Sequence, residues 1–248
     1  MLKKRLLISL TFLDGVLFRT KNFKPDYRYT KNFLDLWSID ELLLIDISEN
    51  KFSKEFLDLI KYFSLNCYVP ISVGGGIKNI DHADIYFKTG ADKVILGSNC
   101  LDQTSTINSI SKKYGNQSII QSIDCIKNFE IKNKYNVMKN SGRDFLNDNP
   151  LNSCQKAILN GAGEILINSI DNDGSLLGYD LGLISYISKN INCPLLALGG
   201  AGNWQHMLDL FLKTDISGAC TQNIFHFTEE SILSAKKFLT NNNVEVRK

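Results

Sequence analysis

Apolar residues occur along this chain in short continuous runs, each followed by a longer segment of different periodicity. Such runs are typical of strands in a parallel sheet, because both faces of that sheet are covered and no alternation with polar residues is needed. The pattern predicts strands at about Arg5–Thr11, Glu41–Ile47, Tyr68–Val73, Lys93–Leu96, Ser118–Asp124, Glu164–Ile170, Leu195–Leu198 and Ile216–Cys220.

Between these runs, apolar side chains recur every three or four positions, which is the spacing of one helix face. This periodicity predicts helices at Lys54–Ser64, Asp81–Thr89, Ser105–Tyr114, Asn152–Asn160, Leu183–Lys189, Trp204–Lys213 and Glu229–Leu239. Alternating strands and helices in about 250 residues predict an α/β fold, a (β/α)8 TIM barrel, as a single domain over residues 1–248. A doubly wound open sheet is the competing architecture.

Two glycine-rich stretches, Val73-Gly-Gly-Gly76 and Leu198-Gly-Gly-Ala-Gly202, lie about half a chain apart. Nearly the same offset relates the apolar run that starts at Glu41 to the run that starts at Glu164. A duplicated (β/α)4 half-barrel explains this internal repeat, because four strands alone would leave exposed sheet edges. An open sheet does not predict the repeat, so the barrel is favoured.

Two segments interrupt the alternation. Arg19–Tyr29 is predicted to be a long polar loop after the first strand, and Lys127–Asp144, after the fifth, contains a hairpin-like run. Long loops that follow barrel strands lie on the catalytic face. The first is placed to close over a phosphorylated ligand; the alternative is that both are solvated excursions without a role in binding.

Composition narrows the classes of function. With 44% hydrophobic and 22% charged residues, the chain has the make-up of an ordinary soluble globular protein. The net charge of +2, without a basic run interleaved with aromatics, argues against nucleic acid and anionic membranes as partners. The basic, apolar N-terminus resembles a signal peptide, but its apolar run stops at Asp14-Gly15 without a cleavage pattern. We therefore expect a first strand there, and a cytoplasmic protein.

Metal and cofactor chemistry finds little support. The six cysteines and three histidines show no metal-ligand spacing, so we expect free buried thiols, no metal and no cofactor. The run Asp171-Asn-Asp-Gly174 is similar to a calcium loop, but the glutamate required six residues after the glycine is replaced by Asp180. Motifs of serine hydrolases, P-loop ATPases and dinucleotide-dependent enzymes are absent from the sequence.

Active sites of such barrels lie at the C-terminal ends of the strands. Glycines there let backbone N–H groups approach an anion, so the two glycine stretches predict two phosphate sites; tight turns are their alternative role. Asp124 is placed for proton transfer, with loop capping as the alternative, and the turn at Asp173-Gly174 suits substrate hydroxyls. The other candidates are Thr11, Asp14, Asp46, Gly75, Gly76, Gly97, Ser98, Ser169, Asp171, Gly200, Gly202, Gln222 and Asn223.

Ten segments of the chain, taken together, match one known family: Lys4–Ile8, Leu13–Gly15, Ile39–Ile47, Val73–Ile77, Gly90–Val94, Gly161–Leu166, Ser169–Gly174, Gly178–Asp180, Leu198–Gly202 and Phe225–Phe227. Over nearly its whole length and in colinear order, the chain thereby resembles the HisF family, the cyclase subunit of imidazole glycerol phosphate synthase.

The resemblance implies a subunit that receives ammonia from a glutaminase and uses it to cleave and cyclise a bis-phosphorylated ribulosyl substrate. That reaction requires carboxylates on strands 1 and 5 as general acid and base. Asp124 matches the second, whereas the first position holds Thr11, whose hydroxyl does not ionise near neutral pH. Two milder departures are Arg19 in place of the family's loop lysine and Gly97-Ser98 in place of Asn-Thr at the first phosphate site.

The resemblance also implies an ammonia gate, a ring of four charged residues at the N-terminal ends of alternate strands. The matching positions are Arg5, Glu41, Lys93 and Glu164, and Asp92 matches the position that faces the glutaminase. Ordinary surface charges are the alternative interpretation.

The residues of the ammonia gate match the family, whereas one of the two carboxylates of the cyclase site is replaced by Thr11. This combination favours a diverged second copy of the subunit. This hypothesis predicts a heterodimer with a HisH-like glutaminase that supplies ammonia to a sugar amidotransferase, for acetamidino groups on a bacterial surface polysaccharide. The alternative is a genuine histidine-pathway lyase in which Asp14 or Asp46 replaces the missing acid. A phosphosugar isomerase on the same repeat also needs the carboxylate missing at Thr11, and does not explain the charged ring.

Overall fold

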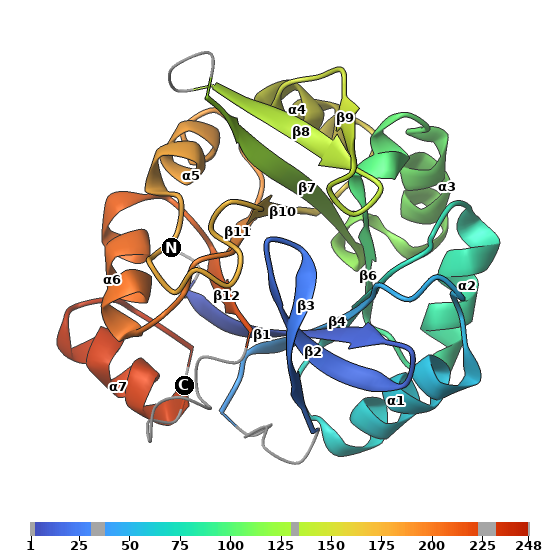
Figure 1. Ribbon diagram of the computed structural model, residues 1–248, viewed down its shortest axis with the longest axis horizontal. Helices are drawn as coiled ribbons and strands as arrows, with labels where there is room; N and C mark the ends of the chain where they lie inside the picture. Colours follow the sequence, from blue (N-terminus) through green and yellow to red (C-terminus); the bar gives the residue numbers. More distant parts are fainter. Residues whose placement is uncertain (1–2, 31–37, 130–133, 223–231, 248) are drawn as a thin grey trace.

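Eight parallel strands close into a barrel in the computed structural model, which describes residues 3–30, 38–129, 134–222 and 232–247 (Figure 1). The barrel strands, in spatial order, are β1 (Arg5–Leu13), β4 (Glu41–Asp46), β5 (Ile71–Gly74), β6 (Lys93–Leu96), β7 (Ile119–Asn128), β10 (Glu164–Ser169), β11 (Leu195–Leu198) and β12 (Gly218–Thr221). Pairing of β12 with β1 completes the circle, so the predicted barrel is confirmed.

An outer layer of helices surrounds the strands (Figure 1). Within the described ranges these are α1 (Lys54–Asn66), α2 (Ile80–Thr89), α3 (Ser105–Tyr114), α4 (Pro150–Leu159), α5 (Leu181–Ser188), α6 (Trp204–Lys213) and α7 (Ile232–Asn241). Most begin at a polar cap; Asn79, Asn149 and Asn203, for example, each accept a hydrogen bond from a backbone N–H three residues on. The first residues of the helix predicted at Glu229–Leu239 lie outside the described part of the chain.

Barrel strands are buried on both faces, as their continuous apolar runs require. One side of each strand packs against the helices in a large core that includes Leu42, Leu44 and Val73. The other side fills the barrel interior with a smaller cluster that includes Leu7 and Leu43. Residues of one strand therefore alternate between the two cores, and this alternation decides which side chains reach the interior.

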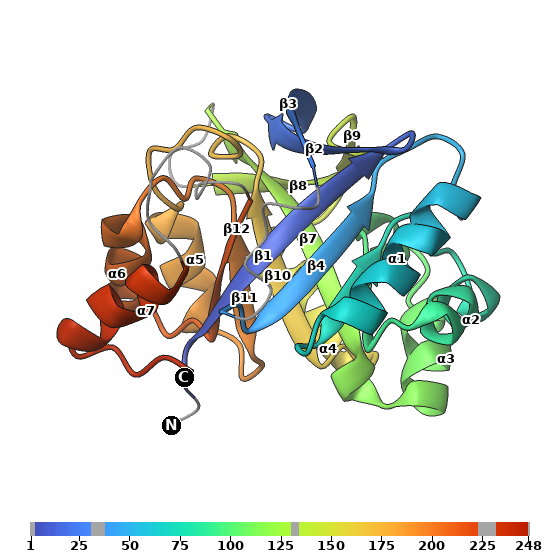
Figure 2. The same cartoon turned by 90° about the horizontal axis from the view of Figure 1, so that it is seen from below.

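Two β-hairpins project from one end of the barrel (Figure 2). The first pairs β2 (Val16–Lys21) with β3 (Lys24–Tyr29), and the second extends β7 through β8 (Lys134–Lys139) and β9 (Asp144–Leu146). The expectation of a long polar loop at Arg19–Tyr29 is therefore wrong. Asn22 and Phe23, both with left-handed φ angles of 51° and 63°, form the two-residue turn that such hairpins favour. The hairpin-like run predicted after the fifth strand is confirmed.

The chain ends meet at the opposite end of the barrel (Figure 2). Lys4 N–H donates to the Glu245 carbonyl at 2.8 Å, and Arg247 N–H donates to the Lys4 carbonyl at 3.1 Å. All six cysteines are free thiols. In the described ranges, no helix has the length and hydropathy that spanning a membrane requires.

Candidate functional site

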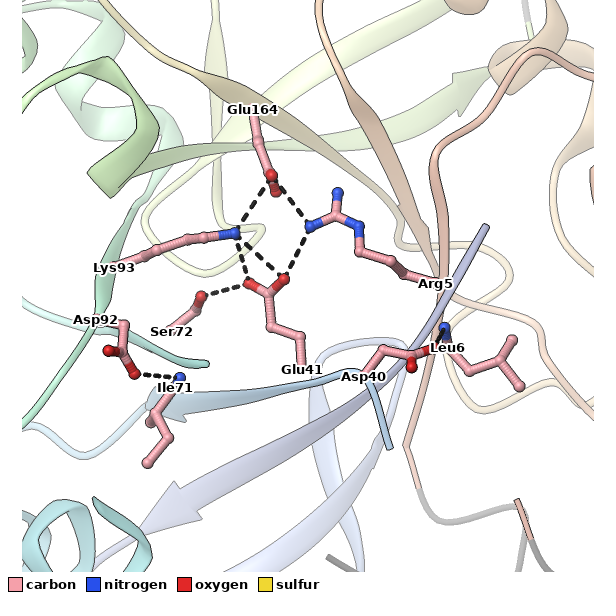
Figure 3. Close-up of polar contacts among 9 residues, drawn as sticks. All are labelled: Arg5, Leu6, Asp40, Glu41, Ile71, Ser72, Asp92, Lys93 and Glu164. Carbon is pink, nitrogen blue, oxygen red and sulfur yellow. Dashed lines mark hydrogen bonds and ion pairs between the residues drawn. The ribbon is translucent and has the colours of Figure 1, made fainter. Parts of the chain in front are cut away.

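Four charged side chains form a closed ring of ion pairs at the N-terminal end of the barrel (Figure 3). Arg5 Nη1 lies 2.9 Å from Glu41 Oε2 and 3.0 Å from Glu164 Oε1. Lys93 Nζ lies 3.1 Å from Glu41 Oε1 and 3.2 Å from Glu164 Oε1. Each cation thus contacts both anions, and the charges alternate in sign around the ring.

The predicted origin of the ring on alternate strands is wrong, because β1 and β4 are neighbours. Barrel interiors take each layer from alternate strands. Glu41, Lys93 and Glu164 obey this rule on the second, fourth and sixth strands, but the eighth strand offers only Gly218 at this level. Arg5, from the neighbouring first strand and opposite Gly218 in the β1–β12 register, supplies the fourth charge instead. A Cβ at Gly218 would lie 2.6 Å from the Leu7 side chain and 2.8 Å from that of Leu196, so only a glycine fits there.

The ring is buried almost completely, with the Glu41 side chain 1% and the Arg5 side chain 8% exposed. Burial lowers the pKa of the Arg5 guanidinium, but the charges of Glu164 and Glu41 outweigh it and raise that pKa overall. Ser72 Oγ donates to Glu41 Oε1 at 2.7 Å, so Glu41 has three polar partners. In contrast, Glu164 Oε2 is buried and makes no hydrogen bond within the described part of the chain.

Asp92 lies beside the ring but belongs to the surface. Its side chain is exposed, and its Oδ2 accepts a hydrogen bond from the Ile71 backbone N–H at 2.8 Å (Figure 3). The carboxylate therefore fastens the start of β5 at the rim of the barrel while facing solvent.

An apolar layer separates the ring from the opposite end of the barrel interior. It is fully buried, and its members are Leu7, Leu43, Ile95, Ile120, Leu166, Leu196, Leu198 and Cys220. Four of them follow the ring residues by two positions on the same strands, so the strand alternation brings them inside.

Asp124 lies beyond this layer, on the interior side of β7. Its Oδ1 accepts hydrogen bonds from Ser122 Oγ at 3.2 Å and Asn168 Nδ2 at 3.5 Å, and its backbone N–H donates to Ser98 Oγ at 3.2 Å. Burial raises the pKa of the Asp124 carboxyl to about 6; the two side-chain hydrogen bonds oppose the shift and the charge of Asp173 adds to it. A carboxyl with this pKa exchanges protons near neutral pH, which suits general acid–base chemistry.

The raised pKa of Asp124 predicts that Asp124→Asn increases the free energy of unfolding by an amount that depends on pH. Between about pH 4 and pH 6 the unfolded chain releases the proton that the folded chain retains, so the wild type loses stability as pH rises through this window. We expect Asp124→Asn to be more stable by about 1–2 kcal/mol at pH 7 and equal to wild type at pH 4. Thermal unfolding at both pH values measures this.

The matched control is Asp209→Asn, because hydrogen bonds from Lys213 and Gln205 lower the pKa of Asp209 instead. It should give no gain at pH 7. An equal effect of Asp124→Asn at both pH values would contradict the raised pKa.

Thr11 occupies the interior side of β1, in the same alternation as Arg5 and Leu7, and is 4% exposed. Neither of the two aspartates predicted as substitutes takes its place. Asp14 lies in the exposed β1–β2 turn. Asp46 falls on the helix side of β4, where its Oδ1 accepts from the Ser48 backbone N–H at 2.9 Å.

The first glycine stretch ends β5 in a tight bend. Gly75 and Gly76 have left-handed φ angles of 117° and 72°, and a Cβ at Gly75 would lie 2.4 Å from the Asp46 carbonyl oxygen. Only glycine fits this close approach of two backbones. At the end of β6, Gly97 has open space around it, and Ser98 is buried with its hydroxyl on the Asp124 backbone.

The second stretch repeats this geometry half a chain later. Gly200 has φ 103°, and a Cβ there would lie 1.9 Å from the Gly178 carbonyl oxygen; a Cβ at Gly202 would lie 2.3 Å from that of Leu176. Asn223, predicted to join this site, lies outside the described residues, as does the matched segment Phe225–Phe227.

The remaining candidates fasten the β2–β3 hairpin over the barrel. Thr20 donates from its hydroxyl to Asp173 Oδ1 at 3.1 Å and receives a 2.7 Å hydrogen bond from Gln222 Nε2. The Phe23 backbone N–H donates to Asp173 Oδ2 at 2.9 Å, so both carboxylate oxygens are engaged. Gly174 packs against the hairpin backbone, where a Cβ would lie 2.5 Å from the Thr20 carbonyl oxygen.

Arg19 pairs with Asp26 across the hairpin. Two residues that contact the predicted site residues were not predicted from the sequence, because they belong to no motif. The first is Thr20, whose partners Asp173 and Gln222 lie far along the chain. Lys51 is the other: it donates to the Asp46 carbonyl oxygen at 2.8 Å, packs under Gly76, and has its pKa lowered by burial. In the described ranges, no group of three His, Cys, Asp or Glu side chains is placed to hold a metal ion.

Known proteins resemble this chain in sequence over most of its length. A model of the family described as "Histidine biosynthesis protein" matches residues 11–231. The "Imidazole glycerol phosphate synthase subunit HisF" of Streptococcus mutans is 32% identical over 260 residues, covering all of both chains. That of Hydrogenobaculum is 35% identical, also over both full lengths. A protein named "Putative imidazole glycerol phosphate synthase subunit hisF2" from Pseudomonas aeruginosa is 35% identical over 233 residues, 92% of each chain.

The family match spans most of the barrel, and relatives of equal length exceed 30% identity. The chain therefore belongs to the histidine biosynthesis protein family, as a member of its HisF group.

Proposed function

We propose that this chain is the ammonia-conducting subunit of a glutamine amidotransferase complex. It receives ammonia from a HisH-like glutaminase at the ring end of the barrel and supplies it at the other end for amidination of a bacterial surface-polysaccharide sugar. In this function the cyclase reaction of the family is impaired at Thr11.

The observation that carries the proposal is the contrast between the two ends of the barrel interior. The ring of Arg5, Glu41, Lys93 and Glu164 is complete at one end. At the other end Asp124 has a threonine on β1 where cyclisation would need a second carboxylate. An entrance for ammonia remains useful without cyclisation only if another enzyme consumes the ammonia.

The interior between the ends suits a small neutral molecule. The apolar layer penalises a charged ammonium ion far more than neutral ammonia, so it selects the nucleophilic form. At the entrance, Glu164 Oε2 is a buried acceptor without a partner among the described residues, able to receive an N–H group as ammonium arrives. Passage through the ring requires Arg5 or Lys93 to swing aside, so the ring acts as a gate.

Two of the matching relatives, from Pseudomonas aeruginosa and Vibrio vulnificus, carry the name hisF2, which distinguishes them from the HisF subunits. We infer that this chain is a second copy of the same kind, with phosphate groups of a nucleotide-linked or phosphorylated sugar held at the two glycine loops. The glutaminase and a sugar amidotransferase are its partners in this proposal.

The direct test supplies purified wild-type protein with the bis-phosphorylated ribulosyl substrate and a high ammonium concentration. We expect turnover to be near background, and robust turnover would contradict the proposal. In a mixture of glutaminase, sugar amidotransferase and this chain, omission of the chain should abolish glutamine-driven amidination. Ammonium-driven amidination should persist, because free ammonia bypasses the barrel.

The second candidate function is the lyase that forms imidazole glycerol phosphate in histidine biosynthesis. One observation favours it: the pKa of Asp124, raised by burial to about 6, is tuned for proton transfer. The same ammonium-driven assay separates the two candidates.

The glutaminase is proposed to dock around the ring, where Asp92 is exposed. Asp92→Lys should weaken co-purification with the glutaminase at least tenfold, because a reversed charge at an interface rim repels its partner. The control is Asp81→Lys, an exposed aspartate in the first turn of α2 near the opposite end. If the wild type, Asp92→Lys and Asp81→Lys all associate equally with the glutaminase, docking does not use this surface.

A further inference from the structure

A hollow of about 620 Å³ lies beside the end of the β8–β9 hairpin and the first turn of α4. Its size falls within the range of roughly 300–1,000 Å³ typical of small-molecule sites. It is separate from the glycine loops and from the barrel interior, and none of the functional assignments above uses it.

Unpartnered amides surround this hollow. Asn136, which is half-buried, and the exposed Asn147 and Asn152 line it, and their side chains make no hydrogen bond to any described residue. The β8–β9 register places Asn136 opposite Asn147, one residue beyond the Val137–Leu146 pair. Each amide offers donors and an acceptor side by side, which matches a vicinal pair of hydroxyls or an acetamido group.

One wall of the hollow is an aromatic ring. Phe145 is 65% exposed, on a short strand at the edge of the sheet. The C–H groups of a sugar ring stack well on such a face, whose quadrupole attracts weakly positive hydrogens.

The hollow carries no free charge for an ionic ligand. Its acidic member, Asp148, accepts hydrogen bonds from Lys156 Nζ at 2.7 Å and Ser153 Oγ at 3.2 Å, so its charge is already compensated. The chemistry of the lining therefore suits a neutral, polyhydroxylated ligand and not a phosphate.

We propose that this hollow is a saccharide subsite that binds a neutral sugar ring, with Phe145 as the stacking platform and the three asparagines as hydroxyl partners. Phe145 pairs with Met138, which pairs with Asp124, so two strand spacings, roughly 10 Å, separate Phe145 from Asp124 along the sheet. The subsite extends the proposed function to its substrate, and it holds the far sugar of a ligand whose phosphate occupies the glycine loops.

The test uses N-acetylglucosamine as probe with the full chain alone, without glutaminase or ammonia. Saturation-transfer NMR should detect binding of the sugar to the wild type. In NMR spectra of the protein itself, the sugar should shift the side-chain amide signals of Asn136 and Asn147. These signals are identified by their absence from the spectra of Asn136→Ala and Asn147→Ala. Phe145→Ala should weaken binding at least fivefold. Phe129→Ala is the matched control, because Phe129 is 84% exposed on the same hairpin region but outside the hollow.

Inorganic phosphate at saturating concentration should leave sugar binding unchanged, since it occupies the glycine loops. Absence of saturation transfer, or equal binding by wild type and Phe145→Ala, would overturn the saccharide assignment. Competition by phosphate would place the sugar at the glycine loops and likewise overturn it. The ammonia-supply proposal is unaffected by either result, because this experiment involves no ammonia.

Discussion

Thr11→Asp is expected to raise ammonium-driven formation of imidazole glycerol phosphate by about 10²–10⁴-fold over the wild type. The position lies on the interior side of β1, in the alternation that also carries Arg5 and Leu7, and Asp124 is already present on β7. One substitution thus restores the pair of carboxylates that the family's reaction requires. Steady-state turnover with the ribulosyl substrate and ammonium measures the gain.

Thr11→Asn is the control, because it has the size of aspartate without its ionisation. It should remain at the wild-type level. In Thr11→Asp the new carboxylate and that of Asp124 should also titrate as a coupled pair, because the charge on one raises the pKa of the other. The pH optimum of turnover should therefore lie higher than a single carboxylate would give. If Thr11→Asp binds the substrate but its turnover stays at the wild-type level, the cyclase site must differ from that of the family at further residues besides Thr11.

Glu41→Ala is expected to lower the free energy of unfolding by about 3–5 kcal/mol, the cost of breaking a buried ion pair by removing one partner. Glu41 is 1% exposed and contacts Arg5, Lys93 and Ser72. Its loss leaves two buried cations sharing the single carboxylate of Glu164. Thermal unfolding should show a melting temperature roughly 10 °C below wild type.

Asp209→Ala removes an ion pair of a different kind and serves as the control. Its partner Lys213 lies one helical turn away on α6, and the Lys213 side chain is 58% exposed. This change should cost about 0.5 kcal/mol or less. Equal costs for Glu41→Ala and Asp209→Ala would mean that the ring is solvated and does not close the barrel.

The architecture could be predicted from the sequence because each level of pattern agrees with the next. Continuous apolar runs, helical periodicity and the internal repeat all require the same barrel, and β6, β11, α3 and α6 begin and end where the periodicity changes. Positions inside the barrel follow from strand alternation once one interior residue is known.

The β2–β3 hairpin could not be predicted in this way. Its second strand, β3, is polar, contains Pro25 and is exposed over most of its length. Its stabilising contacts come instead from Asp173 and Gln222, at the ends of strands far along the chain. Local sequence does not contain that information.

The members of the ring were predicted from the family resemblance, and the predicted strands that begin at them are the first, second, fourth and sixth, so strict alternation already failed at Arg5 in the sequence. A layer built on alternate strands is the ordinary rule, but the eighth strand has Gly218, without a side chain, at this level, and Arg5 comes from the first strand. That Gly218 lies at the level of the ring becomes visible only when the register of β1 and β12 is known.

The meeting of the two chain ends has a practical consequence for the docking experiments. Lys4 pairs with Val246 directly beside Arg5, so both termini lie at the end of the barrel that carries the ring. An affinity tag at either end would occupy the surface on which the glutaminase is expected to bind. A tag inserted at the Asn140–Gly142 turn between β8 and β9 would leave that surface free, and a weak interaction would then not be mistaken for an absent one.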